Sequence, residues 1–473
     1  MAKKNYPAYR DSGIDWLAHI PELWQIKRAK WVFREVDFRS ETGNEELLSV
    51  SEHFGVIKRK NANVNMFKAA SYIGYKLCNP GDLVINSLWA WSRGLGFSKY
   101  HGIVSTAYGV YRPNQNEVGD YQYFHYLLRT KMYVGQYAIR SKGIWISRLQ
   151  LSDKNFLDIP ILIPPKKEQT AIARFLDYKL AKINRFIHKK KQLIKLLNEQ
   201  KTAITNQAVT KGLNPDVKMK DNGIEWLGEI PEHWEVRKLK YVANCFPSNI
   251  DKHSNEDEKQ VRLCNYTDVY KNDYITDSMD LMLATATDEQ IAKFTLLQGD
   301  VIITKDSETA NDIAVPAYVK EPLTDVVCGY HLSVLRPYET LYGEFLFRAL
   351  QCKEINIQFE VRSNGVTRVG LGVYDLKNAK IPVPPINEQT KIVEFISKET
   401  STIYSTISKI EKEIALVEEY KTALITEAVT GKIDVRAYEF PETETEDEGY
   451  EELEEELALA AEESEDYQTE EMQ

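Results

Sequence analysis

Two stretches of the sequence carry apolar residues at the spacing of a long helix that pairs with another helix. The first set is Ile172, Leu176, Ile183, Ile187, Ile194, Leu197, Ile204 and Ala208, with gaps of 4, 7, 4, 7, 3, 7 and 4. Gaps of three, four and seven are typical of a heptad seam. At an offset of 220 every position is again apolar, giving Ile392, Ile396, Ile403, Ile407, Ile414, Val417, Leu424 and Ala428. Each stretch follows a Pro-Pro pair, at Pro164 and Pro384, and we expect an unbroken helix of roughly 70 Å after each pair.

The remaining sequence has the patterns of a mixed α+β fold. Four short runs are rich in β-branched and aromatic residues and predict strands: DLVINS, GIVSTAYGVYR, DVIITK and VVCGYHLSVLR. Residues Tyr121–Tyr137 and Tyr342–Glu360 are predicted to be helical. A group of aromatic residues that precedes Tyr121 is expected to lie mostly in the core: Trp89, Trp91, Tyr100, Tyr108 and Tyr111.

The chain is an internal repeat. DSGIDWLAHIPELWQIKRAKWVF, from Asp11 to Phe33, returns 210 residues later as DNGIEWLGEIPEHWEVRKLKYVA. The helical stretches repeat at 220 without a gap, so insertions are confined to the blocks between them. We therefore expect a first head (residues 1–160), a first long helix region (161–213), a second head (214–380), a second long helix region (381–435) and a tail (436–473).

The two seams are expected to pack on each other. Residues 166–212 hold 12 basic and 3 acidic residues, whereas residues 386–432 hold 6 basic and 8 acidic residues. This contrast favours pairing between the two helices over self-pairing. Antiparallel pairing would place the heads at opposite ends of a rod, related by an approximate two-fold axis. The alternative is a pair of ordinary helices inside one globular domain.

Composition and charge narrow the class of protein. The 473 residues are 43% hydrophobic without a run of about 18 apolar residues, and the N-terminus lacks a signal-peptide pattern, so a cytoplasmic location is expected. The five cysteines form no CxxC pair and are expected to be buried thiols. Residues 441–473 hold 16 acidic and no basic residues, and without them the net charge changes from −10 to +6. We expect this tail to be disordered and to shield the basic heads from DNA.

Two heads at a fixed separation suit DNA, because they can read two half-sites with an unread gap between them. Unlike heads imply an asymmetric target. The order of segments resembles the DNA-specificity (S) subunit of type I restriction-modification enzymes. The resemblance rests on GIDWLAHIPELW and GIEWLGEIPEHW, IPPKKEQTAI and VPPINEQTKI, GDLVI and GDVII, and AVTKGL and AVTGKI, and it spans residues 11 to about 435.

The resemblance implies two target-recognition domains joined by helical regions, in a subunit that carries no chemistry. It implies binding of double-stranded DNA, two methyltransferase subunits and, in the full enzyme, two restriction subunits. S-adenosylmethionine, ATP and Mg²⁺ are expected on those partners. The sequence lacks a GxxxxGK[ST] loop, an NPPY or NPPF motif and HExxH. Two alternatives remain, a stand-alone DNA-binding regulatory protein on the same scaffold and an enzyme with an unrecognised site.

Candidate DNA contacts lie in two loops of each head. One loop follows the Gly-Asp strand, and the other contains Arg-Ser-x-Gly and then diverges between the heads. Arg and Lys can bind phosphates or guanine, and Asn can bind adenine. The candidates are Ser92, Arg93, Lys99, Arg140, Lys142 and Arg148 in the first head and Lys305, Arg362, Asn364, Thr367 and Arg368 in the second. The alternative for each residue is a solvated turn whose arginines pair with local carboxylates. Lys189–Lys191 could contact spacer DNA, although a solvated helix face is the simpler interpretation.

Overall fold

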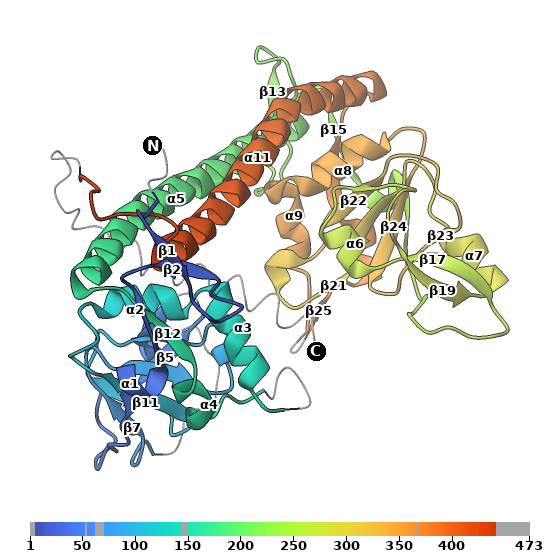
Figure 1. Ribbon diagram of the computed structural model, residues 1–473. Helices are drawn as coiled ribbons and strands as arrows, with labels where there is room; N and C mark the ends of the chain where they lie inside the picture. Colours follow the sequence, from blue (N-terminus) through green and yellow to red (C-terminus); the bar gives the residue numbers. More distant parts are fainter. Residues whose placement is uncertain (1–4, 53, 62–70, 144–148, 366–367, 441–473) are drawn as a thin grey trace. The chain divides into compact units, whose positions relative to one another are not determined.

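The structure is a computed structural model that describes residues 5–440 except 53, 62–70, 144–148 and 366–367 (Figure 1). The chain forms two compact units. Unit 1 comprises residues 1–191 and 412–473, and unit 2 comprises residues 192–411. Each unit therefore contains one head and a part of each long helix.

The predicted long helices are present. Helix α5 runs without a break from Lys166 to Lys211, and helix α11 runs from Ile386 to Val429. At 1.5 Å per residue they are about 69 and 66 Å long. None of the predicted seam residues is exposed: they are either buried or half-buried.

Unit 1 is built on a four-stranded antiparallel sheet in the order β4-β11-β8-β9. The strands are β4 (Phe33–Glu35), β11 (Tyr108–Pro113), β8 (Leu83–Asn86) and β9 (Leu95–Phe97). Four two-stranded pairs surround it: β1 (Tyr9–Asp11) with β2 (His19–Pro21), β3 (Gln25–Arg28) with β12 (Pro160–Ile163), β5 (Leu48–Ser51) with β6 (Gly55–Lys58), and β7 (Lys76–Cys78) with β10 (Gly102–Val104). Its short helices are α1 (Ala29–Val32), η1 (Arg59–Asn61), η2 (Ala90–Ser92), α2 (Tyr121–Leu128), α3 (Lys131–Arg140) and α4 (Asp153–Leu157).

Unit 2 repeats this plan with additions. Its main sheet has the order β16-β24-β20-β22-β18. These strands are β16 (Ala243–Pro247), β24 (Leu332–Pro337), β20 (Val301–Thr304), β22 (Pro316–Val319) and β18 (Tyr274–Ile275). A second sheet has the order β19-β17-β23, with β19 (Met282–Ala286), β17 (Lys259–Cys264) and β23 (Val326–Cys328). The pairs are β13 (Met219–Asp221) with β14 (Glu229–Pro231), β15 (Glu235–Lys238) with β26 (Lys380–Val383), and β21 (Asp306–Ser307) with β25 (Val369–Gly370). The short helices are η4 (Leu239–Tyr241), α6 (Tyr266–Tyr270), α7 (Asp288–Phe294), η5 (Ala310–Asp312), α8 (Gly343–Gln351), α9 (Lys353–Glu360) and α10 (Val373–Asn378).

The sequence predictions need three corrections. The helix predicted over Tyr121–Tyr137 is two helices, α2 and α3, because the chain turns at Arg129 and Thr130. The helix predicted over Tyr342–Glu360 is likewise interrupted at Cys352. Of the five aromatic residues expected mostly in the core, only Tyr111 is buried, whereas Trp91, Tyr100 and Tyr108 are half-buried and Trp89 is 51% exposed.

The aspartate of each Gly-Asp pair is buried and forms the same ion pair with a half-buried arginine in both heads. Arg112 Nε lies 2.9 Å from Asp82 Oδ1, and Arg336 Nε lies 2.8 Å from Asp300 Oδ1. These hydrogen bonds to the carboxylates raise the pKa of both arginines. Because a buried carboxylate needs such a partner, Gly-Asp before one strand and Arg-Pro at the end of the paired strand recur together.

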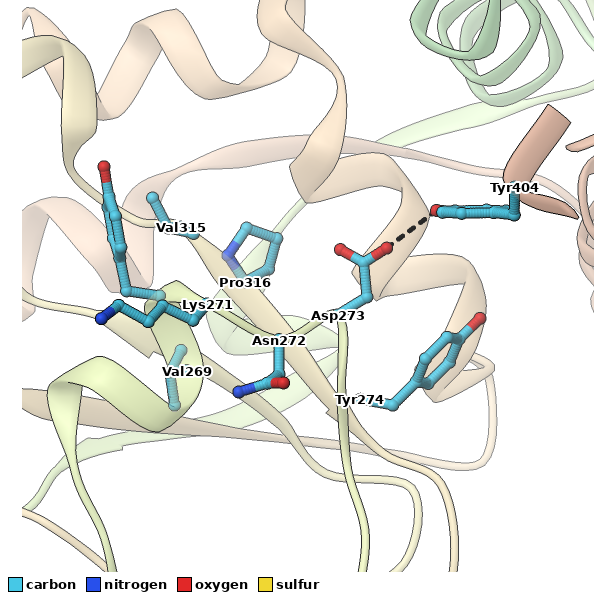
Figure 2. Close-up of a pocket in the computed structure, with 9 residues that line it drawn as sticks. Val269, Lys271, Asn272, Asp273, Tyr274, Val315, Pro316 and Tyr404 are labelled. Carbon is cyan, nitrogen blue, oxygen red and sulfur yellow. Dashed lines mark hydrogen bonds between the residues drawn. The ribbon is translucent and has the colours of Figure 1, made fainter. Parts of the chain in front are cut away.

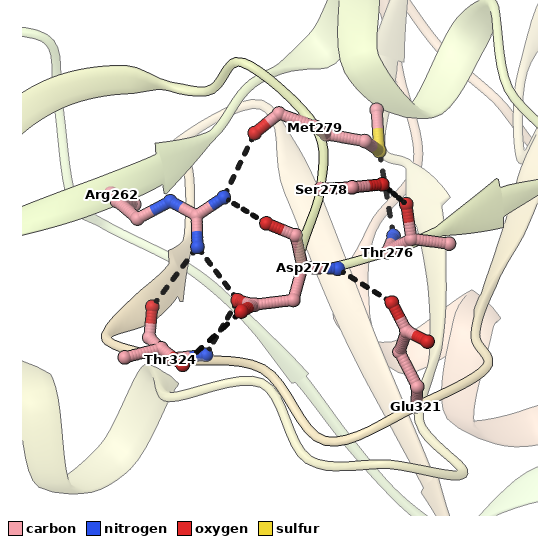
Figure 3. A network of polar contacts seen from close by, with 7 residues as sticks. All are labelled: Arg262, Thr276, Asp277, Ser278, Met279, Glu321 and Thr324. Carbon is pink, nitrogen blue, oxygen red and sulfur yellow. Dashed lines mark hydrogen bonds and ion pairs between the residues drawn. The ribbon is translucent and has the colours of Figure 1, made fainter.

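The second sheet of unit 2 is joined to the main sheet by a polar network around Arg262 (Figure 3). Its guanidinium donates to Asp277 Oδ1 at 2.7 Å and to the carbonyl oxygens of Asp277 and Met279 at 2.7 and 2.8 Å. Asp277 also accepts a hydrogen bond from the Thr324 amide at 2.9 Å. The hydrogen bond from the Thr324 amide, and to a lesser extent the one from Arg262, lowers the pKa of Asp277. The network therefore holds β17 against the segment that follows β18.

The repeated Trp motif holds two helix ends within each unit. In unit 1, Trp24 Nε1 donates to Glu168 Oε2 at 2.9 Å in the first turn of α5. Gly431, just after α11, leaves no room for a side chain, because an added Cβ would lie 2.4 Å from Pro21. In unit 2, Gly212 follows α5 and faces Trp234, and His233 Nε2 lies 2.8 Å from Glu388 Oε2 at the start of α11. Each copy of the motif thus contacts the start of one long helix and the end of the other.

The glutamines of the two Glu-Gln pairs fasten each head to its helix. Gln169 accepts a hydrogen bond from the Gly119 amide at 2.8 Å and donates to the carbonyl oxygens of Glu117 and Pro164 at 3.0 and 2.9 Å. Gln389 makes the matching bonds to the Tyr342 amide and to the carbonyl oxygens of Thr340 and Pro384, at 2.7, 3.1 and 2.8 Å. Both side chains are fully buried.

Replacing either glutamine by leucine should therefore destabilise its own unit. Gln169→Leu removes an acceptor and a donor from a buried site and leaves main-chain groups unpaired, at an expected cost of about 3 kcal/mol in the free energy of unfolding. Gln389→Leu should cost about as much. Denaturant unfolding measures both changes. Thr170→Ala and Thr390→Ala, one residue later on exposed positions, are the matched controls, and equal effects for control and test would contradict the assignment.

The described residues also bear on membrane and thiol chemistry. In the part of the chain that the structure describes, no helix combines the length and hydrophobicity needed to cross a membrane. The five cysteines are buried free thiols, as expected. Burial raises the pKa of Cys78 to about 11, so this thiol is protonated at neutral pH.

Candidate nucleic-acid interface

The loop after β8 in the first head presents two tryptophans. Trp89 and Trp91 stack with ring centroids 5.9 Å apart and an interplanar angle of 18°. Trp91 Nε1 donates to the Leu88 carbonyl at 2.8 Å. Arg93 closes the loop in a left-handed conformation, with φ at 60°. An exposed indole beside Arg93 provides a flat apolar surface and a cation in one loop.

Arg129 holds this loop in place. Its half-buried guanidinium donates to the Arg93 carbonyl at 2.9 Å and to the carbonyl oxygens of Leu95 and Glu52. Burial lowers the pKa of Arg129 to about 10. Ser92 Oγ donates to Glu52 Oε2 at 2.8 Å, so the predicted DNA contact Ser92 also helps to hold the loop.

The Arg-Ser-x-Gly segment of the first head lies beside that loop. The Leu151 amide donates to the Ser87 carbonyl at 2.9 Å, which joins the two segments, and η2 packs against α3. Arg140 is the last residue of α3, and its guanidinium donates a hydrogen bond to Gln136 Oε1. The carbonyl oxygen of Arg140 accepts a hydrogen bond from Asn155 Nδ2 at 2.6 Å. Exposed Lys142 pairs through its backbone with Gln150. The structure thus brings Arg93, Arg140 and Lys142 into adjoining elements.

The two other candidates of the first head are Lys99 and Arg148. Lys99 is exposed after β9. Arg148 lies outside the described residues.

The second head brings its two loops together by strand pairing. Asp306 and Ser307 in β21 pair with Gly370 and Val369 in β25, and the Leu371 amide donates to the Lys305 carbonyl at 2.8 Å. Asn364 pairs with Gly370 across the base of the loop. The loop that carries Arg362, Asn364 and Arg368 therefore lies next to Lys305.

The side chains of this loop are available to a ligand. Arg362, Asn364 and Arg368 are exposed. Asn364 Nδ2 donates to the Arg362 carbonyl at 3.0 Å, which orients the amide. At Gly365 a Cβ would lie 1.9 Å from the Arg368 carbonyl oxygen, so only glycine permits this tight loop. Thr367 lies outside the described residues.

Lys305 lies over the aromatic ring of Tyr330, which is not among the candidate residues predicted from the sequence. Its Nζ is 4.4 Å from the centroid of Tyr330, which is 48% exposed, and 3.4 Å from the Ser248 carbonyl oxygen. In the first head, Arg93 and the exposed Trp89 lie in the same loop, whereas in the second head Lys305 lies directly over the exposed ring of Tyr330. In the sequence, the only signs of these exposed rings are the two tryptophans of LWAW and the tyrosine of CGYH. Such aromatic residues more often lie in a core, so they do not by themselves predict a binding surface.

A pocket marks where the second head meets α11 inside unit 2 (Figure 2). Asp273 from the head accepts a hydrogen bond from Tyr404 of α11 at 2.8 Å, and Lys201 Nζ of α5 lies 4.6 Å over the Tyr404 ring. Burial, and to a lesser extent the negative charge of Asp273, raises the pKa of Tyr404 to about 12. Because these bonds tie the head to the helices, we regard the pocket as part of the scaffold.

In unit 1, the helix positions equivalent to Lys201 and Tyr404 are also in contact. Lys421 Nζ lies 2.7 Å from Asn184 Oδ1. Lys421 and Asn184 are the 220-residue equivalents of Lys201 and Tyr404. Lys190 and Glu413 add an ion pair of 2.8 Å, and Leu176 and Leu180 share a core with Leu424 and Ala428.

The family model of the type I restriction modification DNA specificity domain matches residues 88–196 and 231–416. The matched ranges contain both pairs of loops and more than half of each long helix. The chain belongs to this family. It is a non-catalytic DNA-specificity subunit.

Members of the DNA-specificity family resemble the chain over most of its length. The putative type I restriction enzyme MjaX specificity subunit of Methanocaldococcus jannaschii is 27% identical over 69% of this chain and 71% of its own length. The MjaVIII specificity subunit of the same organism is 25% identical over 77% of this chain and 82% of its own length. A chain from a solved type I R-M system structure covers 87% of this chain and 98% of its own, at 15% identity and a TM-score of 0.64, and shares its fold.

Proposed function

We propose that this specificity subunit recognises an asymmetric bipartite DNA site, with one half-site bound by the first head and the other by the second. It docks two methyltransferase subunits and, in a complete complex, two restriction subunits. S-adenosylmethionine, ATP and Mg²⁺ belong to those partners. The place of action is the cytoplasm, where the chain meets DNA.

One observation carries the proposal: equivalent loops differ while their frame is the same. Asp82–Arg112 and Asp300–Arg336 fix equivalent strands. The loop that follows each strand is LWAWSR in one head and DSETAND in the other. Unlike loops on a shared frame are suited to different base sequences, because side chains that reach base edges determine specificity.

The candidate contacts can be divided by chemistry. Arg140 and Lys142 in the first head and Arg362 and Arg368 in the second can neutralise phosphates or bind guanine, and Asn364 can bind adenine. Arg93 and Lys305 adjoin them, and Ser92, Lys99, Arg148 and Thr367 complete the proposed set. The aromatic rings beside Arg93 and Lys305 can contact thymine methyl groups or sugars.

We further propose that α5 and α11 form an antiparallel coiled coil through their seam residues and that the two units are related by an approximate two-fold axis. The contacts inside the units support antiparallel packing, since early positions of α5 meet late positions of α11. Lys201–Tyr404 and Asn184–Lys421 exchange roles at the 220-residue offset. The unit boundaries fall after Lys191 and after Glu411, which are also 220 residues apart.

In this arrangement, each head and each helix region has its own function. The heads, residues 1–160 and 214–380, bind DNA. The helix regions, residues 161–213 and 381–435, separate them by a fixed distance, so helix length determines the gap between half-sites. Surfaces that both units share suit a partner present in two copies, which is the role we assign to the methyltransferase subunits.

Co-expression with the methyltransferase subunit, followed by hydroxyl-radical footprinting, tests the proposal. We expect the proteins to purify together and to protect two short DNA segments of different sequence, separated by a gap. A chain that binds DNA specifically but never captures the methyltransferase would instead be a stand-alone regulator. One continuous protected segment would contradict two-headed recognition.

A further inference from the structure

The nine residues before the acidic tail fold back onto α5 within unit 1. Tyr438 packs edge-on against Phe175, with ring centroids 4.9 Å apart, and Phe440 packs against Tyr178 at 5.5 Å. Tyr438 and Phe440 also contact each other at 5.1 Å. Val435, which precedes them, is buried. These contacts fix the point from which residues 441–473 depart.

Cations surround this aromatic cluster. Arg174 lies 5.1 Å over the ring of Phe440, and Lys179 Nζ lies 5.1 Å over the ring of Tyr438. Lys182 Nζ lies 4.5 Å over the ring of Tyr178. Cation–π contacts add to the aromatic packing and hold the segment on the basic part of α5.

The cations continue along one face of the helix. We define the basic stripe as Arg174, Tyr178, Lys182, Arg185 and Lys189, which are spaced by 4, 4, 3 and 4 residues. This spacing places them on one face, which is opposite to the seam face of Ile172, Leu176 and Ile183. The stripe begins at the aromatic cluster, and the acidic residues of the tail follow directly after Phe440.

The stripe is present on only one of the two long helices. The equivalent positions of α11 are Glu394, Lys398, Thr402, Ser405 and Lys409, which do not form a basic face. A partner bound in two copies requires a surface that occurs twice. A surface that occurs once fits an occupant that occurs once, and the tail is such an occupant, with 16 acidic residues and no basic residue.

We propose that the basic stripe of α5 is the docking surface for residues 441–473 of the same chain, with Tyr438 and Phe440 as the anchor. The stripe is about 22 Å long, and 33 residues can extend over about 100 Å, so the tail reaches all of it. Docking covers the basic stripe with acidic side chains and keeps other polyanions, DNA included, from binding there. In this proposal the surface that the tail shields is the basic stripe of α5.

Zero-length carbodiimide cross-linking of the full chain tests this inference, because it joins carboxylates only to amines in contact. At 50 mM salt we expect links from the acidic residues of 441–473 to Lys182 and Lys189. At 500 mM salt we expect their yield to fall about fivefold, because salt screens such contacts. A mixture of isotope-labelled and unlabelled chains separates links within a chain from links between chains.

Two variants leave both reporter lysines in place. Tyr438→Ala with Phe440→Ala should reduce the yield about threefold by removing the anchor. Arg174→Glu with Arg185→Glu should reduce it by a similar or larger factor through charge repulsion. The matched control is Lys398→Glu with Lys409→Glu at the equivalent part of α11, which should leave the yield unchanged. Links that form only between chains, or that are spread evenly over the lysines of both heads, would overturn the inference.

Discussion

Seven residues added to each long helix should lengthen the gap between the two half-sites by about three base pairs, since seven helical residues span about 10.5 Å and one base pair about 3.4 Å. The insertions belong after Lys191 in α5 and after Glu411 in α11, where the two units divide. A whole heptad in both helices keeps the seam in register. Methylome sequencing of a host that expresses the system would report the new gap, and the half-sites themselves should be unchanged.

An insertion of the same length in a head is the matched control. Glu256 and Asp257 are exposed in the second head, and seven residues between them should leave the gap as it was. An unchanged gap after the helix insertions would contradict the proposal that the helices set the distance. A change in either half-site would also contradict it, because the heads would then depend on the helices for base recognition.

Arg129→Met should impair the first half-site and leave the second intact. Arg129 donates to the carbonyl oxygens of Arg93, Leu95 and Glu52, which fix the loop after β8. Charge-assisted bonds of this kind contribute about 1.5–3 kcal/mol, so discrimination among first half-site sequences should fall about 10- to 150-fold. Methylation rates on duplexes altered in one half-site at a time measure this change.

Arg262→Met is the control in the second head, because Arg262 also binds main-chain carbonyl oxygens but lies in unit 2. It should leave first half-site discrimination at its original level. A lower unfolding midpoint without any loss of discrimination in Arg129→Met would mean that Arg129 stabilises the head without positioning its loop.

Periodicity was sufficient to predict the long helices, because Ile172 to Ala208 and their equivalents keep one spacing over many turns. It was not sufficient at Arg129 and Thr130, where the tertiary bonds of Arg129 override a continuous apolar pattern. The exposure of Trp89 has a similar origin: its neighbour Trp91 supplies a stacking partner, so the ring is held without a core.

Long-range hydrogen bonding explains the other differences. The Glu-Gln pairs suit a first helical turn, but Gln169 also bonds main-chain groups about 50 residues away, which no local pattern reveals. Likewise, Tyr438 and Phe440 precede an acidic tail and have no periodic neighbours, so their packing on α5 follows only from the structure. Comparison of the two repeats was sufficient to predict the candidate loops, whereas the pairing of β21 with β25 that joins them is seen only in the folded structure.

Head exchange followed by methylome sequencing tests two-headed recognition most directly. Residues 12–158 would be replaced by the corresponding head of another specificity subunit and the methylated motif determined. We predict that one half-site changes while the other half-site and the gap are retained. If both half-sites changed together, the heads would not read DNA independently and the account would be wrong.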